Sequence, residues 1–94
     1  MYLHLGNNAV VPHAVVIGIF DLELTSQSRL TKQFLARAQR EGRVETASDD
    51  LPASFVLCQR DGGARVYLSH ISAATLAKRF EKMSADLSNN GDAS

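Results

Sequence analysis

The sequence is poor in several features that would place a protein in a particular class. Its 94 residues include one cysteine, two prolines and no tryptophan, and the formal net charge is zero. Because Cys58 has no second cysteine to pair with, no internal disulfide forms, which favours a reducing compartment. The longest apolar run, residues 14–20, is far shorter than the roughly 20 residues that cross a bilayer. The first residues also lack the basic and apolar regions of a signal peptide, so we expect a cytoplasmic protein without membrane contacts.

The length and composition indicate one small globular domain. Hydrophobic residues make up 45% of the chain and charged residues 21%, which is ordinary for a globular protein. A chain of this length is near the small end of the range in which one core stabilises itself without disulfides or metal. Association with further copies of the chain would therefore add stability.

The zero net charge conceals a segregation of charge along the chain. Residues 29–43 carry a local charge of +4, residues 60–82 carry +3, and acidic residues elsewhere supply the balancing −7. If the two basic segments face the same way in the folded protein, they form one cationic surface that suits a polyanion. The alternative is that these are ordinary solvated charges without a partner.

Residues 26–43 have the pattern of one amphipathic helix. Leu30, Phe34 and Ala38 recur at every fourth position, with Leu35 on the flank, so this side is predicted to pack on the core. The opposite side is cationic and carries Arg29, Lys32, Gln33, Ala36 and Arg40.

Residues at both ends of this segment suit helix termini. Thr25 or Ser26 can cap the start by accepting a backbone N–H. Gly42 stands where a left-handed residue commonly ends a helix. The sequence therefore predicts a helix bounded by these positions.

The remaining segments give strands and a second helix. Apolar alternation and apolar runs predict strands at residues 1–5, 9–11, 14–20, 43–46, 55–59 and 64–69. Ser72 is predicted to cap a helix that runs to about Met83 and carries Lys78, Arg79 and Lys82 on its outer side. The order βββ-α-βββ-α indicates a single small α+β domain, with a mostly antiparallel sheet and two helices. We expect this domain to span residues 1–83 and the polar residues 84–94 to form a disordered tail.

A hairpin is predicted around the turn Asp61-Gly62-Gly63. If the loop consists of residues 61–64, Arg60 faces Arg65 across the two strands. Like charges in that position destabilise the pair unless an anion lies between them. Asp61 is one candidate for that anion, and a phosphate is another.

Residues with catalytic or metal-binding chemistry are few and scattered. Cys58 falls in an apolar strand pattern and reads as a core residue. His4, His13 and His70 lack the spacing of a metal site. Asp49-Asp50 reads as a solvated turn. We therefore expect no enzyme, no metal, no cofactor and no small-molecule substrate.

The basic helices and the arginine-bearing hairpin favour nucleic-acid binding. The sequence shows no aromatic stacking platform, because the phenylalanines fall on predicted core faces and Tyr2 and Tyr67 are far apart. That favours phosphate contacts to a duplex over recognition of single strands.

Several stretches resemble the RemA/RemB family of regulators of biofilm extracellular-matrix genes in Gram-positive bacteria, and the match is to the RemB-like branch. The most specific stretches are YLHLG at residues 2–6 and VYLSHIS at residues 66–72, followed by TLAKR at residues 75–79. The others are VIGI at residues 16–19, FL at 34–35 with EG at 41–42, and LPASFV at 51–56. The resemblance covers the chain from Met1 to about Phe80.

The resemblance implies a cytoplasmic DNA-binding protein that assembles into a ring-like homo-oligomer, with a fold similar to LytTR DNA-binding domains. In that family, arginines from many subunits contact double-stranded DNA. The present sequence departs from the RemA branch at Val15, Leu51 and Pro52, which align with arginines important for DNA binding. His70 also stands where we expect proline.

The DNA-binding residues must therefore differ, and the charge pattern gives the candidates Arg29, Lys32, Arg40, Arg43, Arg60, Arg65, Lys78 and Arg79. The first hypothesis is a ring-forming DNA-binding regulator. The second is an assembly or interaction module that keeps the ring and has lost DNA binding. A small enzyme is a third, and it would require a pocket that joins His4, Cys58 or His70.

Overall fold

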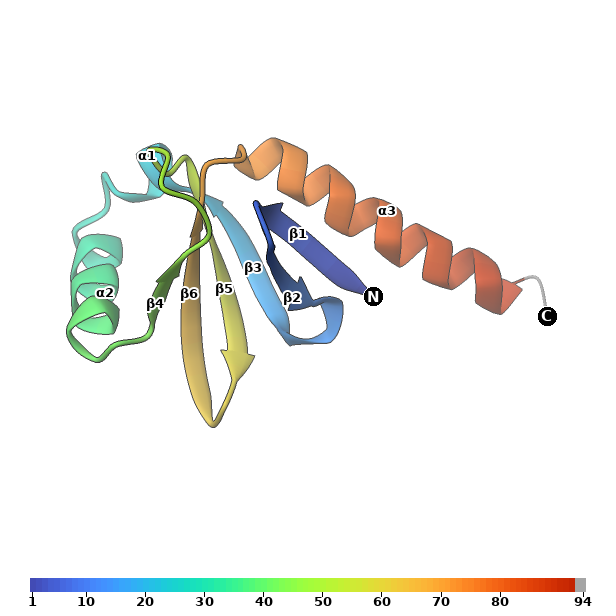
Figure 1. Cartoon of the computed structure of the whole chain (residues 1–94), viewed down its shortest axis with the longest axis horizontal. Coiled ribbons are helices and arrows are strands. Elements are labelled where there is room, and N and C mark those ends of the chain that lie inside the picture. The colour runs from blue at the N-terminus through green and yellow to red at the C-terminus, as the bar shows by residue number, and fades with distance from the viewer. Residues whose placement is uncertain (93–94) are drawn as a thin grey trace.

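The computed structural model describes residues 1–92, with side chains described as far as Ser84 (Figure 1). The element order is β1 (Tyr2–Gly6), β2 (Ala9–Pro12), η1 (His13–Val15), β3 (Val16–Asp21), α1 (Leu22–Thr25), α2 (Arg29–Arg40), β4 (Val44–Thr46), β5 (Ser54–Arg60), β6 (Gly63–Ser69) and α3 (Ala73–Asp92). The predicted α+β class and the order of its main elements are confirmed. The single-turn helices η1 and α1 are additions to the predicted order, and the predicted strand at 14–20 begins only at Val16.

Two sheets form the framework of the fold. The larger sheet has the strand order β3-β5-β6-β4, in which only β4 runs parallel to its neighbour, and β1 and β2 form a separate antiparallel hairpin. The predicted, mostly antiparallel arrangement is thus confirmed. The parallel pairing of β4 with β6 is possible because α2 lies before β4 and a long loop follows it, so β4 is not tied to either neighbour by a tight turn.

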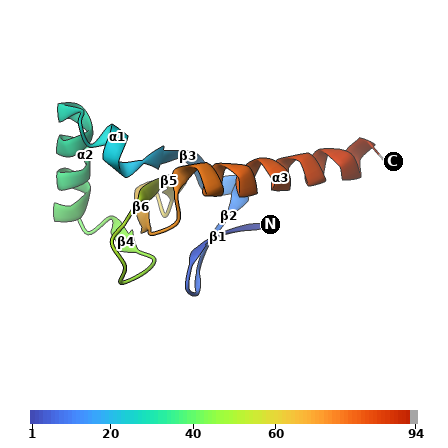
Figure 2. The same ribbon diagram turned by 90° about the horizontal axis from the view of Figure 1, so that it is seen from above.

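The larger sheet is covered on both faces. Side chains alternate along a strand, so Val56 and Cys58 point to one face and Phe55 to the other. The first face packs against Leu3, Leu5 and Val11 of the β1–β2 hairpin and Leu76 of α3. The second face packs, through Phe55 and Val66, against Ala38 of α2. The two longer helices therefore lie on opposite faces of the sheet, as Figures 1 and 2 show from two directions.

The helix predicted at 26–43 is present as α2, which is shorter at both ends, and the short helix α1 precedes it. Asp21 caps α1 by accepting a hydrogen bond from Leu24 N at 2.9 Å, and Ser28 caps α2 by accepting from Thr31 N at 3.4 Å. The predicted caps Thr25 and Ser26 were wrong, because these residues end α1 instead. Gly42 has a φ of +72° directly after Glu41, the C-cap residue of α2, which confirms its predicted role.

The contact face of α2 is narrower than its apolar side. Ala38 is 5% exposed and Leu35 is half-buried, whereas Leu30 is 77% and Phe34 39% exposed. The prediction that Leu30 packs on the core was therefore wrong. Leu30 and Phe34 instead line an open apolar groove together with Phe20 and Leu57.

The β5–β6 hairpin has a tighter turn than predicted. Asp61 and Gly62 have φ values of 55° and 81°, which two-residue hairpin turns require at both positions. The strands pair Arg60 with Gly63 and Cys58 with Arg65. The prediction that Arg60 faces Arg65 was therefore wrong by two positions.

Helix α3 starts as predicted, since Ser72 accepts a hydrogen bond from Thr75 N at 3.2 Å. Leu76 is fully buried, and Phe80 and Met83 pack beside it against the β1–β2 hairpin. The helix continues to Asp92, beyond the predicted end at Met83. The division into a domain at 1–83 and a disordered tail at 84–94 stays a prediction, and residues 93–94 lie outside the described residues.

Candidate nucleic-acid interface

The outer side of α2 gathers three of the eight candidate residues. Arg29, Lys32 and Arg40 are all exposed there, because the buried side of this helix is set by Ala38 and Leu35. Among the side chains that the structure describes, none of the three cations forms an ion pair. This side of α2 therefore presents three uncompensated positive charges to solvent.

The end of α2 is also basic, but its charges are partly compensated. Glu41 lies 3.2 Å from Arg37 and 3.4 Å from Arg43. The guanidinium of Arg43 also packs against the backbone at Gly63, where an added Cβ would lie 3.2 Å from Nη1. Arg43 thus ties the end of α2 to the start of β6, which reduces its availability to a ligand.

The hairpin arginines are engaged with neighbouring side chains. Arg65 lies 3.4 Å from Glu45 and 3.7 Å from Asp61. Arg60 donates a hydrogen bond to the hydroxyl of Tyr67 at 3.3 Å. Electrostatic interaction with Tyr67, together with this hydrogen bond, raises the pKa of Arg60 above its ordinary value. Arg60 therefore stays charged, but both hairpin arginines already have partners within the protomer.

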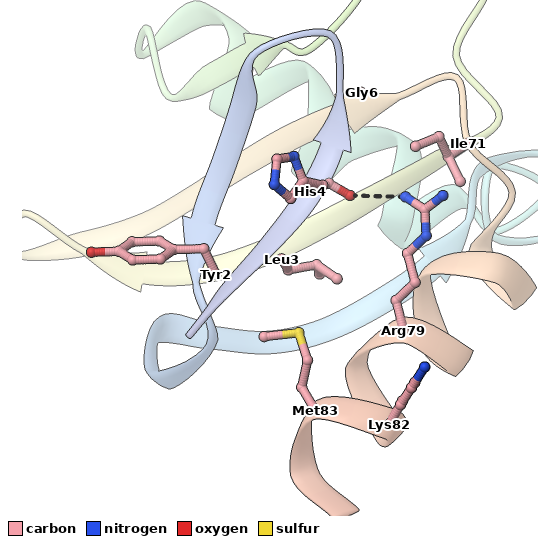
Figure 3. A pocket seen from close by; sticks show the side chains of 8 residues that line it. All are labelled: Tyr2, Leu3, His4, Gly6, Ile71, Arg79, Lys82 and Met83. Carbon is pink, nitrogen blue, oxygen red and sulfur yellow. Dashed lines mark hydrogen bonds between the residues drawn. The ribbon is translucent and has the colours of Figure 1, made fainter. Parts of the chain in front are cut away.

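The remaining candidates, Lys78 and Arg79, lie on α3, on the opposite face of the sheet from α2. Arg79 crosses a pocket between β1 and α3 and donates a hydrogen bond to the backbone oxygen of His4 at 3.5 Å (Figure 3). One protomer does not join the two basic segments into one surface.

The three positions aligned with arginines of the RemA branch are not cationic here and differ in exposure. Val15 and Pro52 are half-buried, while Leu51 is 90% exposed in the loop between β4 and β5. The exposed carboxylates of Asp49 and Asp50 precede Leu51 in the same loop. This loop therefore presents negative charge, which repels a polyanion.

His13, His70 and Cys58 are packed against other parts of the chain. The ring of His13 stacks on Phe80 with centroids 4.0 Å apart, and its Nε2 lies 3.0 Å from Ser84 Oγ. His70 packs against Gly6. Burial raises the pKa of the Cys58 thiol to about 11, a rise that the nearby charge of Arg60 partly opposes. A thiol in that environment is a poor nucleophile at neutral pH.

Among the described residues, no group of three or more His, Cys, Asp or Glu side chains is arranged to hold a metal ion. In the same part of the chain, no helix is both long enough and apolar enough to cross a membrane.

Sequence reasoning missed the pocket between β1 and α3. Tyr2 and Lys82 line it together with Met83, although they lie about 80 positions apart in the sequence. The one available signal was local, because the strand alternation at residues 1–5 leaves Tyr2 and His4 on the outer side. The contact between that strand and α3 depends on the topology of the fold, which the local pattern does not show.

The fold and its surface define a class, which is a small α+β protein that presents a cationic helix on one face of its sheet. No protein-family model matches the sequence. The chain is similar to the extracellular matrix regulatory protein B of Bacillus subtilis (strain 168), with 31% identity over 83 residues, which are 88% of this chain and 94% of the relative. The chain therefore belongs to the extracellular matrix regulatory protein B (RemB) family. The family expected from the sequence motifs is confirmed, and the relative is described as a regulatory protein.

Proposed function

We propose that this protein is a homo-oligomeric, cytoplasmic regulator of extracellular-matrix genes that binds duplex DNA through phosphate contacts and catalyses no reaction. The observation that supports DNA binding is the exposed set of Arg29, Lys32 and Arg40 on α2, which lack acidic partners among the described side chains. Cations that are not neutralised within the protein release counterions from DNA when they bind phosphates, and this drives association.

Assembly is part of the proposal because three cations on one helix give weak binding. Several copies in one ring raise the effective concentration of each contact once the first has formed. In such a ring, Lys78 of one copy can contact the duplex beside α2 of another copy. Specificity would come from the shape and bendability of the DNA, since phosphate contacts carry no base sequence.

The first test is a gel-shift series with duplex DNA from low to moderate salt. The logarithm of the binding constant should fall linearly with the logarithm of the salt concentration, by about 0.9 per phosphate contact. A duplex that is not retained even at the lowest salt would contradict DNA binding. Light scattering on the same samples tests self-association separately.

Charge reversal identifies the surface that binds. The variant Arg29→Glu/Lys32→Glu should lose duplex retention and keep the mass of the assembly. The matched pair is Lys32→Gln and Arg37→Gln, which each remove one positive charge from the same helix: Lys32→Gln should weaken duplex retention, whereas Arg37 is already compensated by Glu41 and serves as the control. The control should retain the duplex with nearly the affinity of the unmodified chain, while equal losses in both variants would point to a nonspecific effect of charge.

A second candidate function is an assembly module without DNA binding. It is favoured by the acidic loop with Asp49 and Asp50, which presents negative charge where the RemA branch aligns arginines. An oligomer that shows no DNA retention, and no response to the Arg29→Glu/Lys32→Glu change, would establish this second function.

A further inference from the structure

The pocket between β1 and α3 combines an apolar lining with two cations. It has a volume of about 700 Å³, is open to solvent, and has Tyr2 and Met83 in its lining. Figure 3 shows Arg79 and Lys82 projecting from α3 beside this opening, with Leu3 at its inner side. Neither cation forms an ion pair with any side chain that the structure describes. The pocket therefore suits an occupant that carries apolar surface and negative charge together.

The loop between β4 and β5, residues 47–53, has that combination. Leu51 is 90% exposed, and the exposed acids Asp49 and Asp50 stand directly before it. These acids form no ion pair among the described side chains. Transfer of an exposed leucine side chain into an apolar site is favourable, so Leu51 gains from burial that its own chain does not provide.

The loop is held in place at both ends. Ala47 N donates to Leu68 O and Ala53 N donates to Ser69 O, both at 2.8 Å. Inside the loop, Asp50 N donates to Ser48 Oγ at 3.0 Å. A loop that is already ordered loses little conformational entropy when it binds.

We infer that the 47–53 loop of one copy docks into the β1–α3 pocket of a second copy, with Leu51 on the apolar lining and the two carboxylates facing Arg79 and Lys82. The inference rests on the proposed self-association and names its interface. Two acids meet two cations, and charges that have no ion-pair partner among the described side chains are neutralised across the contact.

The contact is head to tail, because the loop and the pocket are different surfaces. Leu51 lies beside α1, where it lines a cavity with Asp21 and Glu23, and no residue lines both that cavity and the β1–α3 pocket. Each copy that docks its loop still has a vacant pocket. Such contacts build a closed ring or an open filament, and they leave the cations of α2 exposed.

The apolar groove between α2 and the sheet is a weaker candidate for this interface. Its lining includes Phe20, Leu30 and Phe34 but no charged side chain. It therefore offers no charge complementarity with another part of the chain.

Complementary charge variants test the inference through the solution mass. The loop variant Asp49→Lys/Asp50→Lys and the pocket variant Arg79→Glu/Lys82→Glu should each sediment as the 10.2 kDa single chain where the unmodified protein is oligomeric. The loop variant keeps an intact pocket and the pocket variant keeps an intact loop. In an equimolar mixture, the lysine loop of the first variant meets the glutamate pocket of the second, and the native loop of the second meets the native pocket of the first. Each contact between unlike variants then joins opposite charges, so the mixture should recover an oligomer in which the two variants alternate. The variant that carries all four changes restores opposite charges in every contact and should recover the oligomer.

Two further variants test the apolar contact separately from the charges and test whether the site of a charge change matters. Leu51→Ser removes only apolar surface and should weaken the oligomer without a change in charge, while circular dichroism confirms that each variant is folded. Arg29→Glu/Lys32→Glu makes the same charge change as the pocket variant at a distant site and should leave the mass unchanged. Oligomeric loop and pocket variants would overturn the inference and leave the assembly standing. A single chain at every concentration of the unmodified protein would instead refute the proposed assembly itself.

Discussion

At the scale of single residues, Gly6 shows how the backbone and a neighbouring ring fix one another. Gly6 has a φ of +120°, and a Cβ there would lie 2.6 Å from Cε1 of His70. Gly6→Ala should therefore destabilise the protein by about 1–3 kcal/mol, since it adds backbone strain and a steric clash. The measurement is urea unfolding, with Gly63→Ala as the control. An added Cβ at Gly63 meets only the far end of the Arg43 side chain, so the control should cost less. Equal losses at the two positions would show that the ring of His70 does not confine Gly6.

Cys58 gives a prediction for pH dependence at the same scale. Folding raises the thiol pKa from 9.0 to about 11, so the native state keeps a proton that the unfolded chain loses. The contribution of this thiol to stability is complete below pH 9 and is lost as the pH rises towards 11. Within that window it falls by about 1.4 kcal/mol per pH unit. Urea unfolding of the native chain and of Cys58→Ala at pH 8, 9 and 10 measures this fall as the difference between their stabilities. Lysines and tyrosines titrate in both chains, so their contribution cancels in that difference. A stability difference between the two chains that stays constant over these pH values would contradict the raised pKa.

At the scale of secondary-structure elements, apolar residues of α2 and α3 differ in how much they are buried, and therefore in how much they stabilise the fold. Leu30 is 77% exposed, so Leu30→Gln should change the free energy of unfolding by less than about 0.5 kcal/mol. Leu76 of α3 is fully buried, and Leu76→Ala should cost about 2–5 kcal/mol. Urea unfolding at a dilution where the chain sediments singly compares the two variants. A large loss for Leu30→Gln at that dilution would mean that Leu30 packs within its own chain.

The elements also show what the sequence can predict. Local chemistry placed Gly42 at the end of α2, Ser72 at the start of α3 and the hairpin turn at Asp61, because capping and turn geometry depend on neighbouring residues. Periodicity marked Leu30 as apolar, but it does not say whether a partner element covers that position. The pairing of Arg60 with Gly63 follows from a loop of two residues in place of the four at 61–64 that an Arg60–Arg65 pair needs, and such a difference changes which side chains face one another.

The candidate site was predictable in composition and not in arrangement. The cations of α2 were identified by charge pattern, and the structure leaves Arg29, Lys32 and Arg40 exposed. The ion pairs of Arg65 with Glu45 and Asp61 depend on which strands are neighbours, so the pattern could not show that this charge is compensated. The separation of α2 from α3 is likewise a consequence of the sheet topology.

At the scale of the whole molecule, the proposed DNA binding depends on the proposed assembly, because α2 and α3 lie on opposite faces of the sheet. A single protomer offers α2 alone to a duplex, whereas an oligomer offers several copies of it at once. Linkage then requires reciprocity, so that DNA strengthens the assembly by the same factor by which assembly strengthens DNA binding. A duplex long enough to contact several copies should therefore lower the protein concentration at which the oligomer forms, while a short duplex that reaches one copy should not. Sedimentation of the protein with each duplex, at matched phosphate concentration, measures this. Equal shifts with the two duplexes would mean that DNA acts only as a source of negative charge, and no shift with either would separate assembly from DNA binding altogether.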